Sequence, residues 1–240
     1  MKTIALDIGN TADKLALLVG TPPRVKVVKE FNSVPDKIPP IPEGFDVIYI
    51  SSVVPQKTEI WKNLFLEQAK VDQIKVLTKD FIKKIPMKGP QPQSVGPDRV
   101  LSILGALVRH LPPLVVIDCG SALTFNIVDE KGVFVGGFIA PGMKKMVSTA
   151  SSLAMIPEFD FEQLKFEHTF AGPTQQAVSA GVFNCIRGAV KIGLDEIDHM
   201  FDPSPEIMFT GGCGKLIHDW IGRGQYHPYL VLEGIAIAAT

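Results

Sequence analysis

Short apolar runs separated by polar turns are prominent in both halves of this chain. Three such runs open the chain, at residues 4–8, 14–19 and 24–28. The same series returns almost half the chain later, at residues 115–119, 123–128 and 133–139. Apolar runs of this length that end at Gly, Pro, Asn or Asp are typical of buried strands. The sequence therefore predicts a duplicated set of three strands joined by tight turns.

Helical and strand signals alternate after each set of three strands. In the first half the pattern predicts a proline-rich connection, then a strand, a helix, a strand and a helix, at residues 34–42, 47–50, 56–70, 75–77 and 99–111. In the second half it predicts helices after Gly142 and Thr174, a strand at 206–209 and a helix after Gly212. This alternation indicates an α/β protein of two β-β-β-α-β-α units. Pro112-Pro113 marks the boundary between residues 1–111 and 112–240.

Composition agrees with an ordinary globular protein. Of the 240 residues, 46% are hydrophobic, which is enough for a well-buried core, and the formal net charge is −1. Without a long basic run, the chain has no general attraction to nucleic acid or to an anionic membrane. Three cysteines without metal-ligand spacing indicate reduced thiols. We therefore expect a cytoplasmic protein with neither a nucleic-acid nor a membrane partner.

The first run of each series ends in the same short motif. Asp7-Ile8-Gly9-Asn10 and Asp118-Cys119-Gly120-Ser121 both place an acidic residue and a glycine where the strand turns. Glycine lets backbone N–H groups approach phosphate oxygens, and the hydroxyls of Thr11 and Ser121 are further donors. Asp7 is predicted to hold Mg²⁺ through water, since Mg²⁺ gives up its hydration shell reluctantly. A single Asp-x-Gly could equally be a plain β-turn, but its repetition favours phosphate binding.

A second candidate site is Gly96-Pro97-Asp98-Arg99, at the start of the predicted helix 99–111. Asp98 is expected to cap this helix, where the dipole stabilises a negative charge. Such a carboxylate can accept a proton from an attacking hydroxyl, and Arg99 can bind a carboxylate or hydroxyl of the acceptor. Taken alone, the pair is better explained as an ordinary cap with a solvated arginine.

Six motifs in order extend over essentially the whole chain. They are Asp7 to Thr11, Ile50 to Pro55, Gly96 to Arg99, Asp118 to Phe125, Gly136 to Gly142 and Thr210 to Gly212. Their order and spacing resemble the type III pantothenate kinases. Two β-β-β-α-β-α units in tandem also resemble the ribonuclease H-like fold of actin, hexokinase-type sugar kinases and Hsp70 ATPase domains. In that fold the nucleotide lies in a central cleft between the duplicated halves.

The resemblance implies ATP-dependent phosphorylation of pantothenate to 4′-phosphopantothenate, the first step of coenzyme A biosynthesis. It also implies a homodimer and a monovalent cation, K⁺ or NH₄⁺. By similarity, the ATP-binding residues are Asp7, Ile8, Gly9, Asn10, Thr11, Ala12, Asp13, Lys14 and Ser121. Asp98 corresponds to the proton acceptor and Asp118 to the potassium ligand. The pantothenate-binding residues are Gly96, Pro97, Asp98, Arg99 and Thr174.

The chain departs from the family pattern at several positions. Gly89 occupies the place of a usual Tyr, Ser121 that of a Thr, and Asn126 that of an Asp. Ala12-Asp13 replaces the more usual Asn-Thr. These departures leave open whether Gly89 is compensated elsewhere and how the cation is selected. They also keep open a non-catalytic relative that acts as an accessory factor in transcriptional regulation. A sugar or acetate kinase of the same superfold fits less well, because the chain is short for those enzymes.

Overall fold

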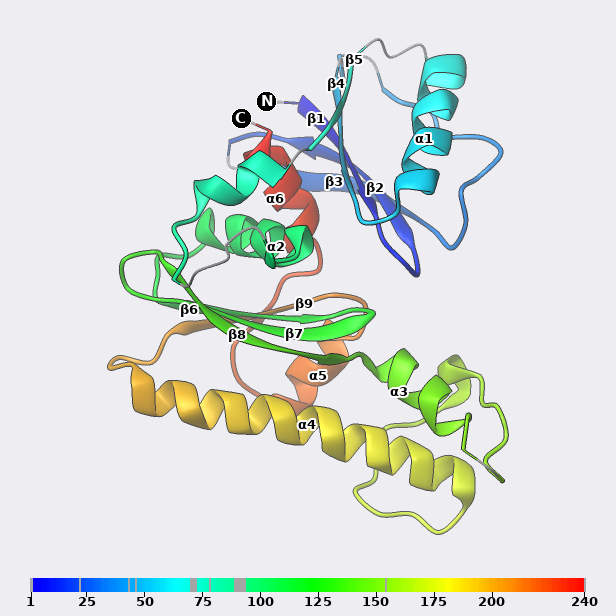
Figure 1. The fold of residues 1–240 in the computed structure, drawn as a ribbon, viewed down its shortest axis with the longest axis vertical. Helices are drawn as coiled ribbons and strands as arrows, with labels where there is room; N and C mark the ends of the chain where they lie inside the picture. The colour runs from blue at the N-terminus through cyan, green and yellow to red at the C-terminus, as the bar shows by residue number, and fades with distance from the viewer. Residues whose placement is uncertain are drawn as a thin grey trace. The chain divides into compact units, whose positions relative to one another are not determined.

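Strands form two five-stranded sheets, one in each of two units of the chain (Figure 1). The computed structural model describes residues 2–21, 23–42, 44–45, 47–69, 73–77, 79–88, 94–153 and 155–239. Unit 1 comprises Met1–Leu111 and Tyr229–Thr240, and unit 2 comprises Pro112–Pro228. The sequence assigns residues 229–240 to the second half, whereas the structure places them in unit 1, where their helix packs on another helix of that unit.

The sheet of unit 1 has the strand order β3-β2-β1-β4-β5. Its strands are β1 (Lys2–Ile8), β2 (Asp13–Val19), β3 (Arg24–Phe31), β4 (Val47–Ser52) and β5 (Gln73–Val76). The first three strands pair antiparallel through tight turns, whereas β4 and β5 run parallel to β1. β1 is the central strand, and its residues Ile4 to Leu6 are fully buried. The predicted strands of the first half are therefore confirmed, with ends shifted by a few residues.

Helices cover the sheet of unit 1. α1 (Pro55–Leu64) continues into a wider helical turn, Phe65–Ala69, and its side chains Trp61 and Phe65 are fully buried against the sheet. α2 (Pro97–Leu107) packs against α6 (Leu230–Ala238), and α6 also contacts β1. A short 3₁₀ helix, Lys79–Lys84, packs beside α2.

The sheet of unit 2 repeats the topology of unit 1. Its strands are β6 (Leu114–Cys119), β7 (Ala122–Val128), β8 (Phe134–Pro141), β9 (Glu206–Thr210) and β10 (Gln225–Tyr226). Their order is β10-β9-β6-β7-β8, so β6 corresponds to β1 and β9 to β4. As in unit 1, the first three strands are antiparallel, and β9 runs parallel to β6. The predicted duplication is confirmed at the level of strand order and direction.

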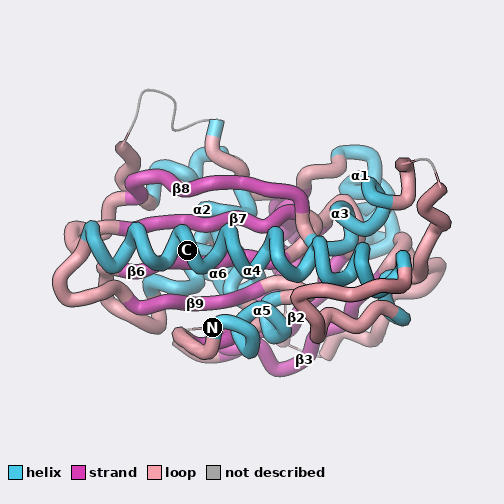
Figure 2. Tube along the Cα trace, turned by 90° about the horizontal axis from the view of Figure 1, so that it is seen from below, coloured by secondary structure: helices cyan, strands magenta, loops and turns pink. Residues whose placement is uncertain are grey.

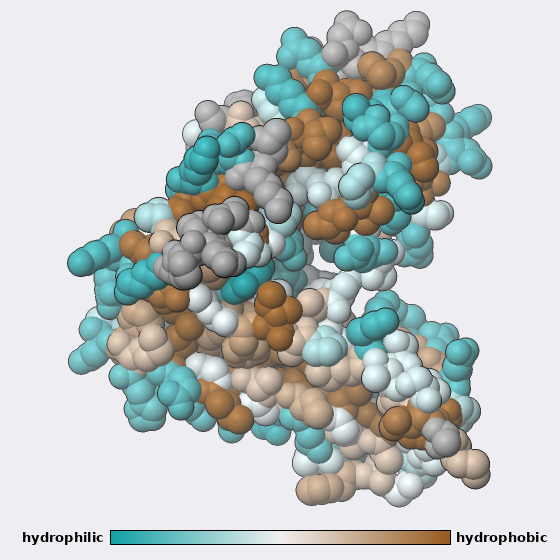
Figure 3. Space-filling model, viewed as in Figure 1, coloured by the Kyte–Doolittle hydropathy of each residue, from teal (hydrophilic) through white to brown (hydrophobic). Residues whose placement is uncertain are grey.

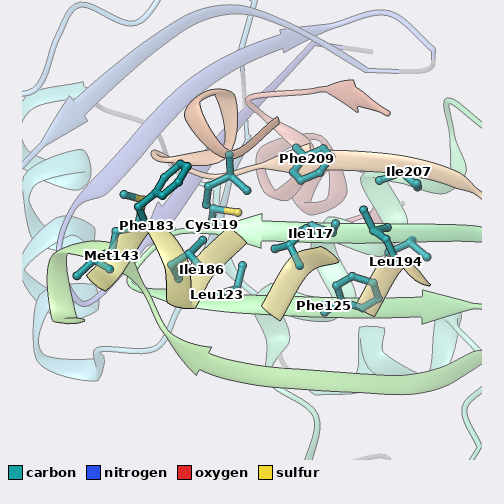
Figure 4. Packing of buried hydrophobic residues seen from close by; sticks show 14 of the residues in the cluster. Ile117, Cys119, Leu123, Phe125, Met143, Phe183, Ile186, Leu194, Ile207 and Phe209 are labelled. Carbon is teal, nitrogen blue, oxygen red and sulfur yellow. The ribbon is translucent and has the colours of Figure 1, made fainter. Parts of the chain in front are cut away.

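One face of the unit 2 sheet packs against a long helix. Helices α3 (Met143–Ala150) and α5 (Gly214–Ile221) flank α4 (Thr174–Met200), which lies along the strands (Figures 1 and 2). Phe183, Ile186 and Leu194 of α4 pack on Ile117 and Phe125 of the sheet (Figure 4). This is one continuous core, because side chains of α3 and α5 join the same cluster.

By length and composition alone, α4 passes as a membrane-spanning segment. In the structure it is instead an amphipathic core helix, since Phe183, Ile186, Val190, Leu194 and Ile197 are buried in unit 2. Its remaining faces carry charged side chains such as those of residues 187, 191, 195 and 196. On the face of the molecule shown in Figure 3, hydrophilic and apolar residues are interspersed.

Two local predictions are wrong. α2 begins at Pro97 rather than Arg99, with Gly96 in the cap position, because proline suits the first position of a helix. It ends at Leu107 rather than Leu111, where the N–H groups of Arg109 and His110 both donate to the Ala106 carbonyl.

The order of elements in unit 1 is the one predicted for residues 34–111, a proline-rich connection followed by strand, helix, strand and helix, and it differs only from the general β-β-β-α-β-α description of a unit. Within the described part of residues 32–46, no helix separates β3 from β4, so the chain passes from strand to strand through a proline-rich segment. Proline lacks the N–H group that a helix interior requires. In unit 2, by contrast, helices α3 and α4 do lie between β8 and β9.

Candidate active site

The turn between β1 and β2 carries the first predicted phosphate-binding motif. The two strands pair antiparallel with Asp7 opposite Lys14, and residues 10–11 are exposed. The N–H group of Gly9 donates to the carbonyl oxygen of Ala12 at 3.2 Å, which closes the turn. A Cβ atom at Gly9 would lie 2.8 Å from that same oxygen, so a larger residue would force the backbone to move. The turn therefore requires glycine at this position.

Asp7 lies at the carboxyl end of the central strand, beside a second polar residue. The parallel strand β4 places Ser51 next to Asp7, and the Val53 N–H group donates to the Ile8 carbonyl at 3.2 Å. Asp7 is half-buried. In open α/β sheets, ligands bind outside the carboxyl ends of parallel strands. Asp7 and Ser51 thus offer a carboxylate and a hydroxyl where a nucleotide is expected.

Asp13, at the start of β2, is enclosed by side chains of helix α1. Its side chain is fully buried, with the indole Nε1–H of Trp61 donating to Oδ2 at 2.9 Å. Lys57 Nζ donates to Asp13 Oδ1 at 3.1 Å and to the carbonyl oxygen of Gly9 at 3.2 Å. Asp13 is predicted as an ATP-binding residue, but its carboxylate is occupied inside unit 1. The role of Asp13 in ATP binding stays a prediction, and both of its carboxylate oxygens already have partners within unit 1.

The second candidate motif forms the start of α2. Gly96 is extended, Pro97 is the first helical residue and Asp98 follows in the first turn, with its carboxylate exposed. A Cβ atom at position 96 would lie 2.6 Å from Asp98 Oδ1, so glycine leaves room for this carboxylate. Burial lowers the pKa of the half-buried Arg99 guanidinium, and the negative charge of Asp98 opposes that shift. The motif thus presents a carboxylate to solvent, next to a partly desolvated cation.

The turn between β6 and β7 carries the corresponding motif of unit 2. Asp118 lies opposite Thr124 of β7 and next to Thr210 of the parallel strand β9. Gly211 has a left-handed φ of +87°, and a Cβ atom there would lie 2.4 Å from Asp118 Oδ1. The Gly142 N–H group donates to the Ser121 carbonyl at 3.0 Å. Glycines from two other motifs therefore close around the Asp118 turn.

Asn126, which stands where the family usually has Asp, is fully buried in the unit 2 sheet. Its side-chain amide donates to Thr124 Oγ1 at 3.0 Å and to the Val116 carbonyl at 3.3 Å. Because Thr124 pairs with Asp118 across the two strands, Asn126 supports the residue beside the candidate cation ligand. An uncharged side chain also suits this fully buried position.

The cysteine next to each glycine turn of unit 2 is a poor nucleophile. Burial raises the pKa of the Cys119 thiol well above its usual value, and the neighbouring Asp118 and Cys213 raise it further. Burial also raises the pKa of Cys213, against an opposing effect of Lys144. Since the thiolate is the reactive form, neither residue suits a role in covalent chemistry.

The predicted site residues divide between the two units. Those of the first turn and of Gly96 to Arg99 lie in unit 1, whereas Asp118, Ser121 and Thr174 lie in unit 2. Thr174 is the exposed first residue of α4. Gly89 lies outside the described residues. The central cleft that would bring these groups together stays a prediction.

Lys57 was not among the predicted site residues. It lies on helix α1 and donates hydrogen bonds to Gly9 and Asp13 of the turn between β1 and β2. A signal for it does exist in the sequence. Asp13 falls on an inward position of an apolar strand, and a buried carboxylate requires a charged or hydrogen-bonding partner. Lys57 and Trp61 are four residues apart, which places them on one face of the helix.

Within the residues that the structure describes, no three His, Cys, Asp or Glu side chains group to hold a metal ion. Mg²⁺ does not require such a group, because it typically takes one or two protein carboxylates together with phosphate and water oxygens. Asp7, the predicted magnesium residue, lies near the end of β1, and its role stays a prediction.

Comparison with solved structures defines the class of the fold. A Baf family transcriptional activator from Campylobacter jejuni is similar with a TM-score of 0.60 at 21% identity, covering 98% of this chain and 96% of the other. The activator of 2-hydroxyisocaproyl-CoA dehydratase from Clostridium difficile, solved with ADPNP, has a TM-score of 0.53 at 11% identity, with 100% and 96% covered. The ROK hexokinase from Thermus thermophilus has a TM-score of 0.50 at 12% identity, covering 99% of this chain and 98% of the other. The chain thus has the duplicated ATPase fold of the hexokinase class, as predicted.

Comparison of sequences then identifies the family. The family model for type III pantothenate kinase matches residues 3–194. The type III pantothenate kinase of Synechocystis is 31% identical over 220 residues, which are 91% of this chain and 80% of the relative. That of a Sulfurihydrogenibium species is 30% identical over 192 residues, 78% of this chain and 74% of the relative. The chain belongs to the type III pantothenate kinase family.

Proposed function

We propose that this protein is a pantothenate kinase, which uses ATP with Mg²⁺ to form 4′-phosphopantothenate and ADP in the first step of coenzyme A biosynthesis. The observation that carries the proposal is the duplicated acidic turn in a chain of this family. Asp7 and Asp118 occupy equivalent places at the carboxyl ends of β1 and β6, each beside a hydroxyl residue of the parallel neighbour. A fold that binds a nucleotide between two halves requires such a turn in each half.

Residues of the first turn bind the nucleotide in this proposal. The backbone of Ile8 to Ala12 and the side chains of Thr11 and Lys14 contact the phosphates, together with Ser121 of unit 2. Asp7 holds Mg²⁺ through water, and the ion offsets charge on the phosphate oxygens. The tight, glycine-dependent closure of the turn supports this role, because it fixes backbone groups in place before a ligand binds.

Asp98 is the proposed catalytic base. The primary hydroxyl oxygen of pantothenate attacks the γ-phosphorus in line, the bond from that phosphorus to the bridging oxygen of ADP breaks, and Asp98 takes the hydroxyl proton. Its exposure at the start of α2 supports this role. Phosphoryl transfer depends mainly on positioning and charge, so the base chiefly orients the hydroxyl. Arg99, Gly96, Pro97 and Thr174 hold pantothenate, whose carboxylate suits a guanidinium.

A monovalent cation, K⁺ or NH₄⁺, is proposed at Asp118. The strand register sets Thr124 and Thr210, both with hydroxyl groups, next to Asp118 on the two neighbouring strands, which supports a site of oxygen ligands here. Hard cations take oxygen ligands of this kind. Such an ion would offset phosphate charge and order the acceptor side of the site. We further propose a cytoplasmic homodimer with neither a nucleic-acid nor a membrane partner.

A coupled assay tests the function directly. Purified protein is mixed with ATP, Mg²⁺, K⁺ and pantothenate, and ADP formation is followed beside mass-spectrometric detection of 4′-phosphopantothenate. We expect ADP only when pantothenate is present, in a one-to-one ratio with the phosphorylated product. ADP release without that product would contradict the proposal.

The rival function, an accessory factor in transcriptional regulation, is not favoured. The likeness to a structure with such a name is at 21% identity and concerns the fold alone. A protein that only binds a partner has no need for the exposed Asp98 next to Arg99. Absence of any pantothenate-dependent turnover in the same assay would reopen this alternative.

A further inference from the structure

Lys57 of helix α1 contacts the turn between β1 and β2. Lys57 Nζ donates to two oxygens at once, Gly9 O at 3.2 Å and Asp13 Oδ1 at 3.1 Å. These two residues bracket the turn, since Gly9 follows β1 and Asp13 begins β2. One ammonium group therefore ties both ends of the turn to α1.

The carboxylate of Asp13 is held just as firmly on its other side. The indole N–H of Trp61 donates to its second oxygen at 2.9 Å. Trp61 is itself fixed by stacking on Phe65, with 5.5 Å between ring centroids, and by an edge contact with Phe31 at 5.3 Å. The side chain of Asp13 is fully buried and that of Lys57 is 23% exposed. A buried carboxylate with both oxygens bonded has little freedom to move.

The start of α1 is also fixed relative to the strand ends. Thr58 Oγ1 donates to Ser52 Oγ at 2.7 Å, and the Val54 N–H group donates to the same oxygen at 3.0 Å. β4 pairs with β1 beside Asp7. The bonds to Ser52 therefore fix the start of α1, which carries Lys57, relative to the carboxyl end of β1.

The bond to Gly9 has a direct consequence for the neighbouring amide. A peptide bond is planar and trans, so the carbonyl of Gly9 and the N–H group of Asn10 point in opposite directions. The hydrogen bond from Lys57 directs the Gly9 carbonyl toward α1. The Asn10 N–H group therefore points away from α1. Asn10 is exposed. A backbone N–H group that is fixed at a glycine turn is a donor suited to a phosphate oxygen.

We propose that Lys57 and Asp13 form a positioning pair that sets the Gly9–Asn10 peptide for nucleotide binding. This inference rests on the proposed function, since it requires the first turn to bind ATP. The pair acts through the backbone of the turn and does not contact the reacting atoms. Its loss should therefore weaken nucleotide binding far more than it slows the chemical step.

The main test compares Lys57→Met with Lys62→Met. Lys62 is a matched control on the same helix, because its ammonium group pairs with the exposed Glu59 at 3.0 Å. Titration calorimetry with Mg²⁺·ATP, without pantothenate, gives the affinity independently of turnover. We expect Kd for ATP to rise about tenfold or more in Lys57→Met and less than twofold in Lys62→Met. KM for pantothenate and kcat at saturating ATP should change less than about threefold.

A double variant separates positioning from stability. Lys57→Met alone leaves a buried carboxylate without its cation, which destabilises the fold. Adding Asp13→Asn removes that charge while keeping an oxygen for Trp61, so Tm should recover. If the pair positions the peptide, Kd for ATP stays raised in the folded double variant. Recovery of both Tm and wild-type Kd would overturn the proposal, as would wild-type affinity in folded Lys57→Met.

The binding measurement also distinguishes failure of the inference from failure of the proposed function. A wild-type protein that binds ATP but never phosphorylates pantothenate would contradict the function, while the comparison of variants still decides the role of Lys57. A wild-type protein that does not bind ATP would overturn both.

Discussion

Arg109, just after α2, binds both carboxylate oxygens of Glu233 on α6 through Nε and Nη2, with 2.8 Å between Nε and Oε2. The two residues are far apart in the sequence, yet the Glu233 side chain is only 3% exposed. This pair ties the last helix of the chain to the helix that carries Asp98.

Arg109→Met should destabilise the protein because it leaves a buried carboxylate without its cation. Breaking a buried pair typically costs about 3–5 kcal/mol, and partial exposure of Arg109 reduces the expectation to roughly 1–3 kcal/mol. Urea unfolding followed by circular dichroism gives the difference. The control is Lys83→Met, whose pair with Asp80 is 82% and 76% exposed and should matter by less than about 0.5 kcal/mol. Equal stability of the two variants would contradict this account of the pair.

Two glycines let α2 and α6 approach closely. A Cβ atom at Gly105 would lie 2.1 Å from the Leu230 carbonyl oxygen, and one at Gly234 would lie 1.9 Å from that of Leu101. Gly105→Ala should therefore force the helices apart and lower the free energy of unfolding by roughly 1–3 kcal/mol.

Gly188→Ala is the matched control for that substitution. Gly188 also lies inside a helix, α4, and a Cβ atom there meets nothing within 4 Å. Since alanine favours the helix by about 1 kcal/mol over glycine, this variant should be slightly stabilised. Thermal unfolding of both variants gives the comparison, and equal shifts in Tm would mean that Gly105 and Gly234 are not there for close packing.

Much of the fold could be predicted because local signals and the final structure agree. The strands around Asp7 and Asp118 are apolar runs that end at glycine turns, so pattern alone locates them. The placement of α6 in unit 1 depends on Gly105, Gly234 and the Arg109 pair, which are long-range contacts without a local pattern. The start of α2 was misplaced because the first-position preference of Pro97 outweighs the capping tendency of Asp98.

The candidate site could be predicted in part only. Motif resemblance identifies Asp7, Asp98 and Asp118, and the structure places the first and third at equivalent strand ends. Motif resemblance does not identify Lys57 and Trp61, the partners of the buried Asp13, because they come from a distant helix.

Thiol labelling tests the environment of the Asp118 turn. Burial and the neighbouring negative charges raise the pKa of Cys119, and burial raises that of Cys213, so at pH 8 both hold less thiolate than a free cysteine. Cys185 is exposed on α4. Iodoacetamide at pH 8 should modify Cys185 first and Cys119 last, as peptide mass spectrometry would show. A higher pH should speed the slow reactions, and rapid labelling of Cys119 in folded protein would contradict the structure.

Exchange of the monovalent cation tests the role of Asp118. If this carboxylate holds K⁺, replacing K⁺ and NH₄⁺ with Na⁺ should suppress turnover by an order of magnitude or more, because the smaller ion fits the same oxygens poorly. Asp118→Asn should lower activity in K⁺ and abolish the difference between the two salts. Initial rates at constant ionic strength measure the effect. Equal wild-type rates in K⁺ and Na⁺ would contradict the proposal that Asp118 binds the cation.

The most direct measurement is the steady-state kinetics of Asp98→Asn with ATP and pantothenate, beside the exposed control Glu130→Gln. A general base contributes about 10²–10⁴-fold to the rate, so kcat should fall by that factor in Asp98→Asn. Its affinity for Mg²⁺·ATP and its Tm should stay near those of the wild type, and Glu130→Gln should turn over normally. Near-normal turnover in folded Asp98→Asn would contradict the assignment of this carboxylate as the proton acceptor.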